Sequence, residues 1–501
     1  MNEANTCRCR VQDKSCAASG PGAARIRSTA RRNSFNNSSP IYSRQDLLAP
    51  EKLYMNSNQR ALDFALDTKW NDLPKTVQHQ GKRALLDNLG VLIAGGITPA
   101  SRIIHAFVED QMVANSPTEA CTVVSTGKTV SAVGAALANG IAANALDMDD
   151  GYNAAKGHPG AALLPVLLAS AELATGVNGR DFLAALVVGY ELAIRAAMIR
   201  HATYTTYHST GSWGAIGGAA AGGKLLDLDF GQLRCAMGIA EYFAPIAPMM
   251  KGIEVVAMTK DSISWGAMVA MSSILLASKG FTGIDPIFAD GPGPELTKGL
   301  GRDWFILDLY HKPYACCFWV QPPIAGALAL IKDHDLTPEQ ITRIRVHSFR
   351  EATRLSCAVP RDTEEAQYNL AYGLACAVRK GKVGPSEVTP PAISDPQTLA
   401  FMAKVEPVED QEIQKGYPAK RQAQVEITTT DGRVLDSGVV DARWGVSADR
   451  PTDQDLIEKF QMVTGPVLGQ TRAQALQDMI WNLEREPRAA RLVDLATAKG
   501  L

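Results

Sequence analysis

Residues 145–160, ALDMDDGYNAAKGHPG, hold the densest set of side chains that could do chemistry. Asp147, Asp149 and Asp150 are followed by a glycine-containing turn, His158 and a proline, and apolar stretches lie on both sides. Loops that join rigid helices are where functional groups collect. A carboxylate beside an imidazole supplies the orientation and proton transfer that general acid/base catalysis needs. Each aspartate taken singly is equally a polar helix end in solvent, so the case rests on the combination.

A magnesium site is the alternative reading of this acidic segment. Residues 149–153, DDGYN, faintly resemble the DDxxD motif with which isoprenoid synthases hold Mg²⁺. Those enzymes also use a second acidic motif and a basic set, which the later segments lack. The adjacent Cys316 and Cys317 have no further soft ligands at zinc-finger spacing and are typical of buried packing. The sequence therefore favours a site without metal.

Four other short motifs carry reactive or charged groups. They are YHSTG at 207–211, MTK at 258–260, KPYACC at 312–317 and EAQYNLAY at 365–372. The first stands before a Gly/Ala-rich helix whose N-terminal N–H groups are suited to an anion. Taken alone, a histidine such as His208 is more often a capping or core residue, and a single lysine is usually a solvated charge.

Composition excludes several classes of protein. The 501 residues include 50 Lys plus Arg and 52 Asp plus Glu, so the basic face that nucleic-acid binding needs is absent. No apolar run reaches the roughly 20 residues that span a bilayer, and we expect no membrane segment. The nine cysteines contain no CxxC pair and no secretory framework, which favours an intracellular protein with reduced thiols.

The N-terminal segment differs from the rest in composition. Residues 1–46 hold eight basic and three acidic residues and few large apolar side chains. Such a segment cannot offset its own ordering entropy, and we predict a disordered tail over residues 1–50. Its Arg and Ser content is also similar to that of a mitochondrial transit peptide, so a cytoplasmic and a mitochondrial location both stay open.

The elements that must position these motifs are mostly helices. From residue 58 onward, apolar residues recur at three and four positions, which predicts helices over residues 83–92, 131–146, 161–173, 180–198, 214–226, 231–242 and 262–276. Glycine is a poor helix former, so the segment GAIGGAAAGG at 214–223 makes sense only where helix backbones approach closely in a buried bundle.

The pattern changes after residue 304. Residues 341–349 and 423–430 alternate apolar and polar positions, Asp431-Gly432 reads as a type I′ hairpin turn, and 433–440 as the return strand. A helix over 364–379, with Thr363 as N-cap, lies between the strands, and helices return at 453–462 and 472–483. We therefore predict a mainly α protein, with a large all-helical domain built from both chain ends (residues 51–308 and 445–501) and an inserted smaller α+β lid domain (residues 309–444).

The order of the motifs, followed by the strand pair and EKF at 458–460, resembles the MmgE/PrpD family from about residue 58 to nearly the end. That family includes 2-methylcitrate dehydratase, cis-aconitate decarboxylase and an iminodisuccinate epimerase. The resemblance implies the fold predicted above, a homodimer, a small di- or tricarboxylate substrate and catalysis without metal or other cofactor. It also places pocket residues at Asp147, His158, His208, Lys260, Lys312 and Tyr372.

The sequence departs from a decarboxylase-like pocket at three places. Gly151 stands where such a pocket has threonine, Cys317 where it has histidine, and residues 261–264 lack the histidine often found after the MTK lysine. A less polar lining suits a substrate with an apolar branch. We therefore expect a hydro-lyase that dehydrates 2-methylcitrate or a related alkylcitrate. The alternatives are cis-aconitate decarboxylase, a dicarboxylate epimerase or isomerase, and a carboxylate-binding protein without activity.

The expected roles follow from the charge of the substrate. A tricarboxylate in a buried site needs compensation, which Lys260, Lys312 and a protonated His208 would supply. His158, oriented by Asp147, would remove the proton next to a carboxylate, while Tyr372 helps the hydroxyl leave as water.

Overall fold

The computed structural model describes residues 57–446 and 449–497. The tail predicted for residues 1–50, with its transit-peptide alternative, lies outside these residues. Helices dominate the described chain and strands are few, so the mainly α fold class is confirmed.

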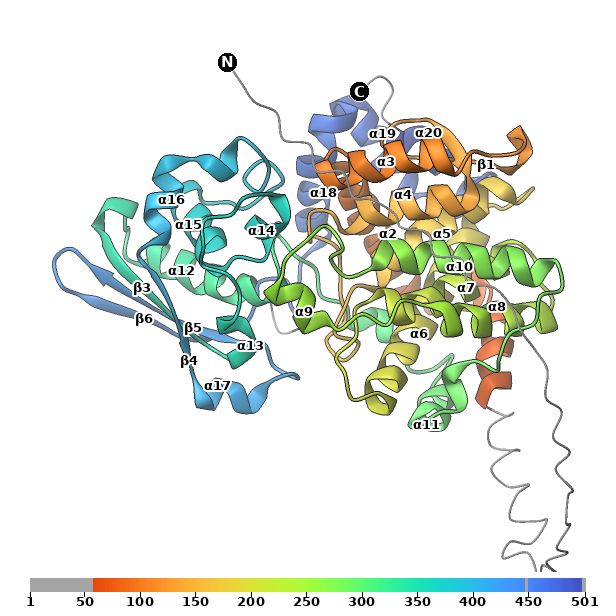
Figure 1. Cartoon of the computed structure of the whole chain (residues 1–501), viewed down its shortest axis with the longest axis horizontal. Helices are drawn as coiled ribbons and strands as arrows, with labels where there is room; N and C mark the ends of the chain where they lie inside the picture. Colours follow the sequence, from red (N-terminus) through yellow and green to blue (C-terminus); the bar gives the residue numbers. More distant parts are fainter. Residues whose placement is uncertain (1–56, 447–448, 498–501) are drawn as a thin grey trace, which may run out of the picture. The chain divides into compact units, whose positions relative to one another are not determined.

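Most helices of the first 308 residues pack around one apolar core, and the C-terminal helices join them (Figure 1). A first helix runs through residues 57–67. The others are α2 (Lys75–Gly95), α3 (Pro99–Gln111), α4 (Ala132–Asn144), α5 (Pro159–Leu173), α6 (Gly179–Thr203), α7 (Gly211–Leu225), α8 (Phe230–Phe243), α9 (Met249–Glu254), α10 (Ile263–Ser278) and α11 (Gly293–Lys298), followed near the C-terminus by α18 (Asp453–Leu468), α19 (Gln470–Trp481) and α20 (Arg491–Ala496).

Helix α7 explains the glycine-rich segment of the sequence. It packs against α5, α6, α8 and α10. A Cβ atom on Gly214 would lie 2.5 Å from the Cβ of Ala162, and one on Gly217 would lie 2.5 Å from the Cβ of Ala193. The helix backbones can approach this closely only because these positions are glycine, as the sequence predicts.

The sheet-containing part follows from residue 309. Its main sheet has the strand order β4-β3-β5-β6, in which β4 runs parallel to β3 and the other pairs are antiparallel. Helix α12 packs on β5 and β6, and α15 packs on α12 and β4 (Figure 1). The elements are α12 (Gln321–Asp333), β3 (Ile341–Ser348), α13 (Arg350–Thr353), α14 (Thr363–Gln367), α15 (Leu370–Lys380), α16 (Pro396–Met402), β4 (Val405–Glu409), α17 (Gln411–Gly416), β5 (Ala423–Thr429) and β6 (Val434–Val440).

Neither helix α3 nor helix α12 was predicted from the sequence, and two short strand features were also missed. Strands β1 (Ala120–Thr122) and β2 (Thr129–Ser131) form a small hairpin between α3 and α4, and β4 lies at an edge of the main sheet. Strand β4 contains Pro407, whose missing N–H is tolerated at an edge.

The β5–β6 connection corrects the predicted turn type. A type I′ turn needs a positive φ at both central residues, whereas of Asp431 and Gly432 only the glycine has one, at 85°. The N–H of Gly432 donates to the carbonyl of Thr429 at 3.1 Å, and the N–H of Thr429 donates to the carbonyl of Arg433 at 2.9 Å. The connection is a three-residue loop that ends in a left-handed glycine, because only that position needs glycine's freedom.

The single helix predicted over residues 364–379 is two helices. Asp362, not Thr363, caps α14, and Asn369 caps α15 by accepting a hydrogen bond from the N–H of Tyr372 at 2.8 Å. An asparagine side chain that satisfies a free helical N–H starts a new helix and ends the previous one. The break leaves Tyr368 and Asn369 between the helices.

The helical and sheet-containing parts share contacts within one compact unit. Helix α18 packs on α2, which returns the C-terminal segment to the first helices. A second apolar core joins side chains of the sheet-containing part to Leu146 and Met148, the neighbours of Asp147. We propose on this packing that residues 309–444 form a domain inserted in the helical one.

Helix α6 is long and apolar enough, by length and composition, to cross a membrane, and α2 with α3 would count only as a bent pair. However, 94% of the apolar window of α6 is buried within the protein, as in the core helix of a globular domain.

Candidate active site

Asp147 lies three residues after the end of α4, between Leu146 and Met148 of the second apolar core. Its backbone has a left-handed φ of 53°, and Lys260 and Ser262 have φ values of 41° and 53°. Such conformations are unfavourable for residues with a side chain and tend to cluster at functional sites, where the surrounding structure holds them. Asp147 is buried, with a relative exposure of 1%.

Lys312 neutralises Asp147. Its Nζ donates to Oδ1 of Asp147 at 3.0 Å, and the lysine is fully buried. Burial by itself raises the pKa of Asp147, but the charges of Lys312, Lys260 and His158 outweigh it and hold the pKa below its ordinary value. Burial lowers the pKa of Lys312, and Asp147 with Asp149 outweighs this and raises it. The pair is therefore ionised.

Hydrogen bonding fixes which nitrogen of His158 can act as a base. Nδ1 lies 2.7 Å from the carbonyl oxygen of Asp150, which can only accept, so Nδ1 carries the proton. When the ring is neutral, the lone pair is therefore on Nε2, which lies 3.8 Å from Oδ1 of Asp147 and 3.7 Å from Oδ2 of Asp261. His158 is the residue before α5, whose first position is Pro159.

Asp261 is a residue of the site to which the sequence analysis assigned no role. Its Oδ1 accepts from the hydroxyl of Tyr368 at 3.2 Å and its Oδ2 from the hydroxyl of Thr210 at 3.3 Å. Burial raises the pKa of Asp261, and although His158 opposes this, the pKa stays above its ordinary value. Asp147 and Asp261 thus lie near the same imidazole nitrogen with pKa values shifted in opposite directions. The one sequence feature that could have identified Asp261 is its position directly after Lys260 of the MTK motif.

The two lysines differ in their partners. Nζ of Lys260 donates to the carbonyl oxygen of Asn144 and, at 2.6 Å, to Oε1 of Gln367, both of which are uncharged. Among residues 57–446 and 449–497, no carboxylate forms an ion pair with Lys260, which is 9% exposed. The charge of Lys312 is balanced by a direct ion pair with Asp147. The charge of Lys260 acts on Asp147 and Asp261 only without direct pairing, so Lys260 can still pair with an anionic ligand.

Tyr372 does not join this cluster. Its hydroxyl donates to the carbonyl oxygen of Glu387 at 2.6 Å, within the sheet-containing part. The tyrosine hydroxyl at the cluster is that of Tyr368, in the break between α14 and α15. Tyr368 was not singled out from the sequence, because one continuous helix was predicted and Asn369 was not recognised as a helix cap.

His208 is buried apart from the cluster. Its ring stacks near His201, with centroids 6.0 Å apart, and meets the ring of Tyr204 edge-on. Burial, together with the charges of Arg200 and Lys156, lowers the pKa of His208. This favours the neutral imidazole, against the protonated form expected from the sequence.

Gly151 and Cys317 both border the cluster. The backbone N–H of Cys317 donates to the carbonyl of Gln367 at 3.0 Å, and burial first, then the charge of Asp147, raises the pKa of its thiol to about 12. Gly151 forms a two-way backbone bridge with Tyr310 at 3.0 and 2.9 Å. A Cβ on Gly151 would lie 2.1 Å from Cζ of Tyr310. The ring of Tyr310 therefore occupies the space that a side chain at position 151 would need.

We predict that Gly151→Ala lowers the free energy of unfolding by about 1 to 3 kcal/mol, because the bridge prevents the backbone from yielding and the ring of Tyr310 must move. Chemical denaturation measures the change. The matched control introduces the same alanine into a Tyr310→Ala background, where the cost should nearly vanish. An equal cost in both backgrounds would show that the ring is not the obstacle.

The loop that carries these groups is held from two sides. Asp150 accepts hydrogen bonds from the hydroxyl of Tyr190 and, at 3.1 Å, from the N–H of Gly160 at the start of α5. Lys459 of α18 donates to the carbonyl of Met148 at 2.7 Å and to Asp87 at 2.6 Å. Lys459 is the lysine of the EKF motif. These contacts position the loop and leave Asp147 and His158 for chemistry.

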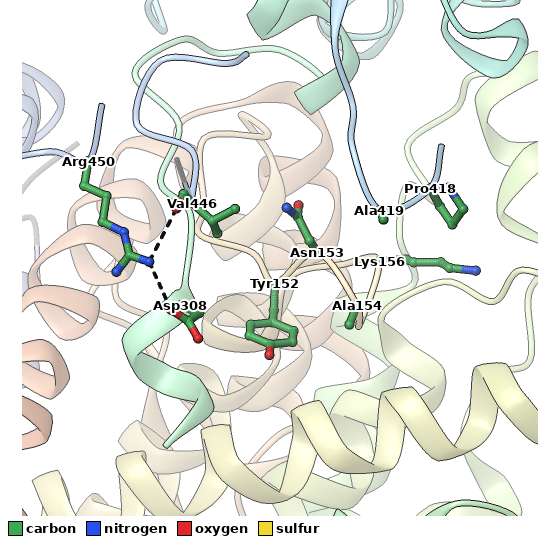
Figure 2. A pocket seen from close by; sticks show the side chains of 9 residues that line it. All are labelled: Tyr152, Asn153, Ala154, Lys156, Asp308, Pro418, Ala419, Val446 and Arg450. Carbon is green, nitrogen blue, oxygen red and sulfur yellow. Dashed lines mark hydrogen bonds and ion pairs between the residues drawn. The ribbon is translucent and has the colours of Figure 1, made fainter. Parts of the chain in front are cut away.

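A pocket of about 660 Å³ opens beside the same loop (Figure 2). Loop residues Tyr152, Asn153, Ala154 and Lys156 line it together with Asp308, Pro418, Ala419, Val446 and Arg450. In the described part of the chain, no three His, Cys, Asp or Glu side chains gather as metal ligands. Catalysis without metal stays a prediction.

Comparisons with known proteins agree with these motifs. The family model for the MmgE/PrpD N-terminal domain matches residues 59–295, and that for the C-terminal domain matches residues 314–485. A cis-aconitate decarboxylase-like protein of Aspergillus oryzae is 25% identical over 480 residues, 87% of this chain and 96% of the relative. The cis-aconitate decarboxylase of Aspergillus terreus is 25% identical over 86% of this chain and 94% of its own, and that of Mus musculus is 24% identical over 83% and 88%. The chain belongs to the MmgE/PrpD family.

Proposed function

We propose that this protein is a lyase that dehydrates 2-methylcitrate or a related alkylcitrate without a metal or other cofactor. One observation carries the proposal. Nε2 of His158 lies 3.8 and 3.7 Å from two buried carboxyl groups, Asp147 and Asp261, whose pKa values are shifted in opposite directions. Environments that separate the pKa values of neighbouring groups assign one to the base side and one to the acid side of a reaction.

Dehydration uses both sides at once. Nε2 of His158 takes the proton from the carbon next to a substrate carboxylate, and the ionised Asp147 stabilises the imidazolium that forms. The carbon–oxygen bond breaks, a carbon–carbon double bond forms, and the protonated carboxyl of Asp261 gives its proton to the departing hydroxyl, which leaves as water. The charge of Lys260 stabilises the substrate carboxylate as its neighbouring carbon loses the proton. Apo distances of this size shorten when substrate binds.

The lining of the site supports an alkyl-bearing substrate. Position 151 has no side chain, and Cys317 offers a protonated thiol where an imidazole would offer a strong polar contact. The ring of Tyr310 packs at 4.2 Å from that of Phe318, beside Gly151. Aromatic and small residues can pack against an apolar branch of the substrate. Polar side chains in the same place would lose their contacts with water and gain no hydrogen-bond partner.

Decarboxylation of cis-aconitate is the second candidate, and it is favoured by the names of the relatives in Aspergillus and mouse. In that reaction the carbon–carbon bond to one carboxylate breaks, carbon dioxide leaves, and protonated His158 gives a proton to the carbon. Only one proton donor is required, so the reaction does not explain the second carboxyl group at Nε2. An epimerase or isomerase of a dicarboxylate is the third candidate.

Proton NMR separates these candidates. The purified protein is incubated in chelator-containing buffer with 2-methylcitrate, with a longer alkylcitrate and with cis-aconitate. We expect alkene formation from one or both alkylcitrates at a rate that the chelator does not change. Itaconate from cis-aconitate, with both citrates intact, would replace the dehydratase by the decarboxylase. A ligand that raises the melting temperature yet stays unchanged in every tube would indicate a binding protein.

The raised pKa of Asp261 predicts a pH dependence. The acid form donates the proton, so kcat falls as pH rises through the pKa of Asp261, which lies above the ordinary value of 3.8. Asp261→Asn should lower kcat about a hundredfold and remove that basic limb. The pH profile of kcat for both proteins measures this. An unchanged basic limb in the variant would assign it to another group.

We also propose a homodimer, as the resemblance implies. Tyr242, Phe243, Phe281 and Ile284 line one small surface pocket near the ends of α8 and α10 and are 47 to 69% exposed. Large exposed apolar side chains of this kind are typical of surfaces that a partner covers. Light scattering coupled to size exclusion should give twice the mass of the chain, and a monomer at micromolar concentration would contradict the proposal.

A further inference from the structure

Arg421 is a buried cation that has no anionic partner in the part of the chain that the structure describes. It stands two residues before β5 and is 7% exposed. One guanidinium nitrogen donates to the carbonyl of Asn153 at 3.2 Å, and the group lies 5.7 Å from the ring centre of Phe318. Its Nε has no hydrogen-bond partner among the described residues, and none of their carboxylates forms an ion pair with it. A buried arginine is usually paired, because an unpaired charge is costly to remove from water.

A second cation lies close by. Lys156 is half-buried on the 151–158 loop, with Nζ 5.5 Å from the ring centre of Tyr207. No carboxylate of residues 57–446 or 449–497 forms an ion pair with it. Burial first, and then the charge of Arg421, lowers the pKa of Lys156. Two neighbouring cations repel each other, so an anion between them would relieve both the repulsion and the missing contacts of Arg421.

The position of Arg421 connects a solvent-accessible pocket with the catalytic cluster. Arg421, Asn153 and Phe318 line a pocket of about 240 Å³, which shares Asn153, Ala419 and Val446 with the pocket of Figure 2. On its inner side, Phe318 contacts Tyr310, and Tyr310 stands over Gly151. Burial raises the pKa of Tyr310 to about 12, and the charges of Arg421, Lys312 and Asp147 also act on it, so this ring lies near both the arginine and the Asp147–Lys312 pair.

We infer that Arg421 binds one carboxylate of the substrate at the mouth of the site, opposite the carboxylate held by Lys260. The chemical class of the ligand, a polycarboxylate, rests on the proposed function. The guanidinium has a planar array of donors that fits a carboxylate with two parallel hydrogen bonds, and its unpartnered Nε is one of them. Because Arg421 comes from the sheet-containing part and Asn153 from the helical loop, a bound carboxylate would contact both.

A purely structural role for Arg421 makes a different prediction. If the side chain only ties the segment before β5 to Asn153, its loss weakens every ligand by the same factor. If it binds one carboxylate, its loss matters only for ligands that have that carboxylate. The distinction needs ligands that differ by single carboxylates and that the enzyme cannot convert.

Tricarballylate, glutarate and methylsuccinate form such a set. Tricarballylate has three carboxylates and no hydroxyl to lose, glutarate lacks its central carboxylate and methylsuccinate lacks a terminal one. Isothermal titration of the full-length protein measures their affinities for wild type, Arg421→Gln and Arg421→Lys. Arg450→Gln is the matched control, because Arg450 lines the adjoining pocket but is paired with Asp308 at 3.0 Å (Figure 2).

We expect Arg421→Gln to weaken tricarballylate about 10- to 100-fold, the size of a charged hydrogen-bond pair, and Arg421→Lys to weaken it less. For one of the two dicarboxylates, the same substitution should leave the affinity within about twofold of wild type. Arg450→Gln should change none of the three. Thermal unfolding of each variant without ligand verifies the fold, and Arg421→Lys serves if the glutamine variant is unstable.

Equal losses for all three ligands would overturn the inference and leave a structural tie, and so would an unchanged affinity for tricarballylate. A wild-type protein that binds no tricarboxylate would overturn it as well. Binding of tricarballylate that depends on Arg421, in a protein that turns over neither citrate nor cis-aconitate, would sink the proposed reaction but keep the carboxylate site. Turnover that Arg421→Gln leaves unchanged would overturn the carboxylate site but keep the proposed reaction.

Discussion

His158→Gln lowers kcat for alkene formation at least about a hundredfold and leaves the melting temperature nearly unchanged, which is the usual effect of losing a general base. The ring contributes Nε2 as the lone-pair nitrogen, since the Asp150 carbonyl fixes the proton on Nδ1. Glutamine retains a similar volume and can donate to the same carbonyl, but it has no basic nitrogen. The rate of product formation under substrate saturation measures the effect.

His347→Gln is the matched control for this prediction. His347 lies in β3 and pairs with Glu426 on the neighbouring strand, away from the catalytic cluster. It should lose little activity, which separates the loss of one particular imidazole from a general effect of the substitution. Turnover of His158→Gln at the wild-type rate would remove His158 from the mechanism.

Lys312→Met should destabilise the protein and abolish most of its activity. Breaking a buried ion pair by removing one partner costs about 3 to 5 kcal/mol, because the remaining charge is buried without compensation. Here the remaining charge is Asp147, which is 1% exposed. In the wild-type protein the pKa of Asp147 is lowered, so the pair contributes stability above the ordinary pKa of 3.8 and loses it as pH falls through the folded value.

The destabilisation in the variant also depends on pH. Without Lys312, only Lys260 and His158 oppose the effect of burial, so the pKa of Asp147 rises above its wild-type value. The destabilisation is therefore largest near neutral pH and shrinks as pH falls and the carboxyl group is protonated. Urea denaturation at several pH values measures both effects. Adding Asp147→Asn should restore much of the stability but not the activity. Lys298→Met, which breaks an exposed pair with Glu295, should cost less than about 1 kcal/mol. Equal costs for the buried and exposed lysines would contradict the account.

The sequence predicted the elements better than the contacts between them. Apolar periodicity located most of the long helices, though not α3 and α12, and the strands β3, β5 and β6, because a buried face repeats along each element. The motif order also led to Asp147, His158, Lys260 and Lys312, which the structure brings to one place. A motif is recognised by residue types at short spacing. These four residues belong to such motifs, so the sequence alone was enough to identify them.

The remaining site residues depend on local capping and on contacts between distant segments. Tyr368 reaches Asp261 only because Asn369 ends one helix and starts the next, and a continuous periodic pattern concealed that break. Arg421 comes to the 151–158 loop through the packing of the sheet-containing part, which no local pattern encodes. Protonation states are equally nonlocal, since burial and neighbouring charges, not residue type, shift Asp147 and Asp261 in opposite directions.

The most direct test of the central claim is the initial rate at which the wild-type protein, in chelator-containing buffer, converts 2-methylcitrate or a longer alkylcitrate into its alkene, followed by proton NMR. The account predicts an alkene signal that grows with enzyme concentration and is lost in His158→Gln. Unchanged alkylcitrates over the same period, with a folded protein that still binds tricarballylate, would contradict the claim that this cluster dehydrates an alkylcitrate.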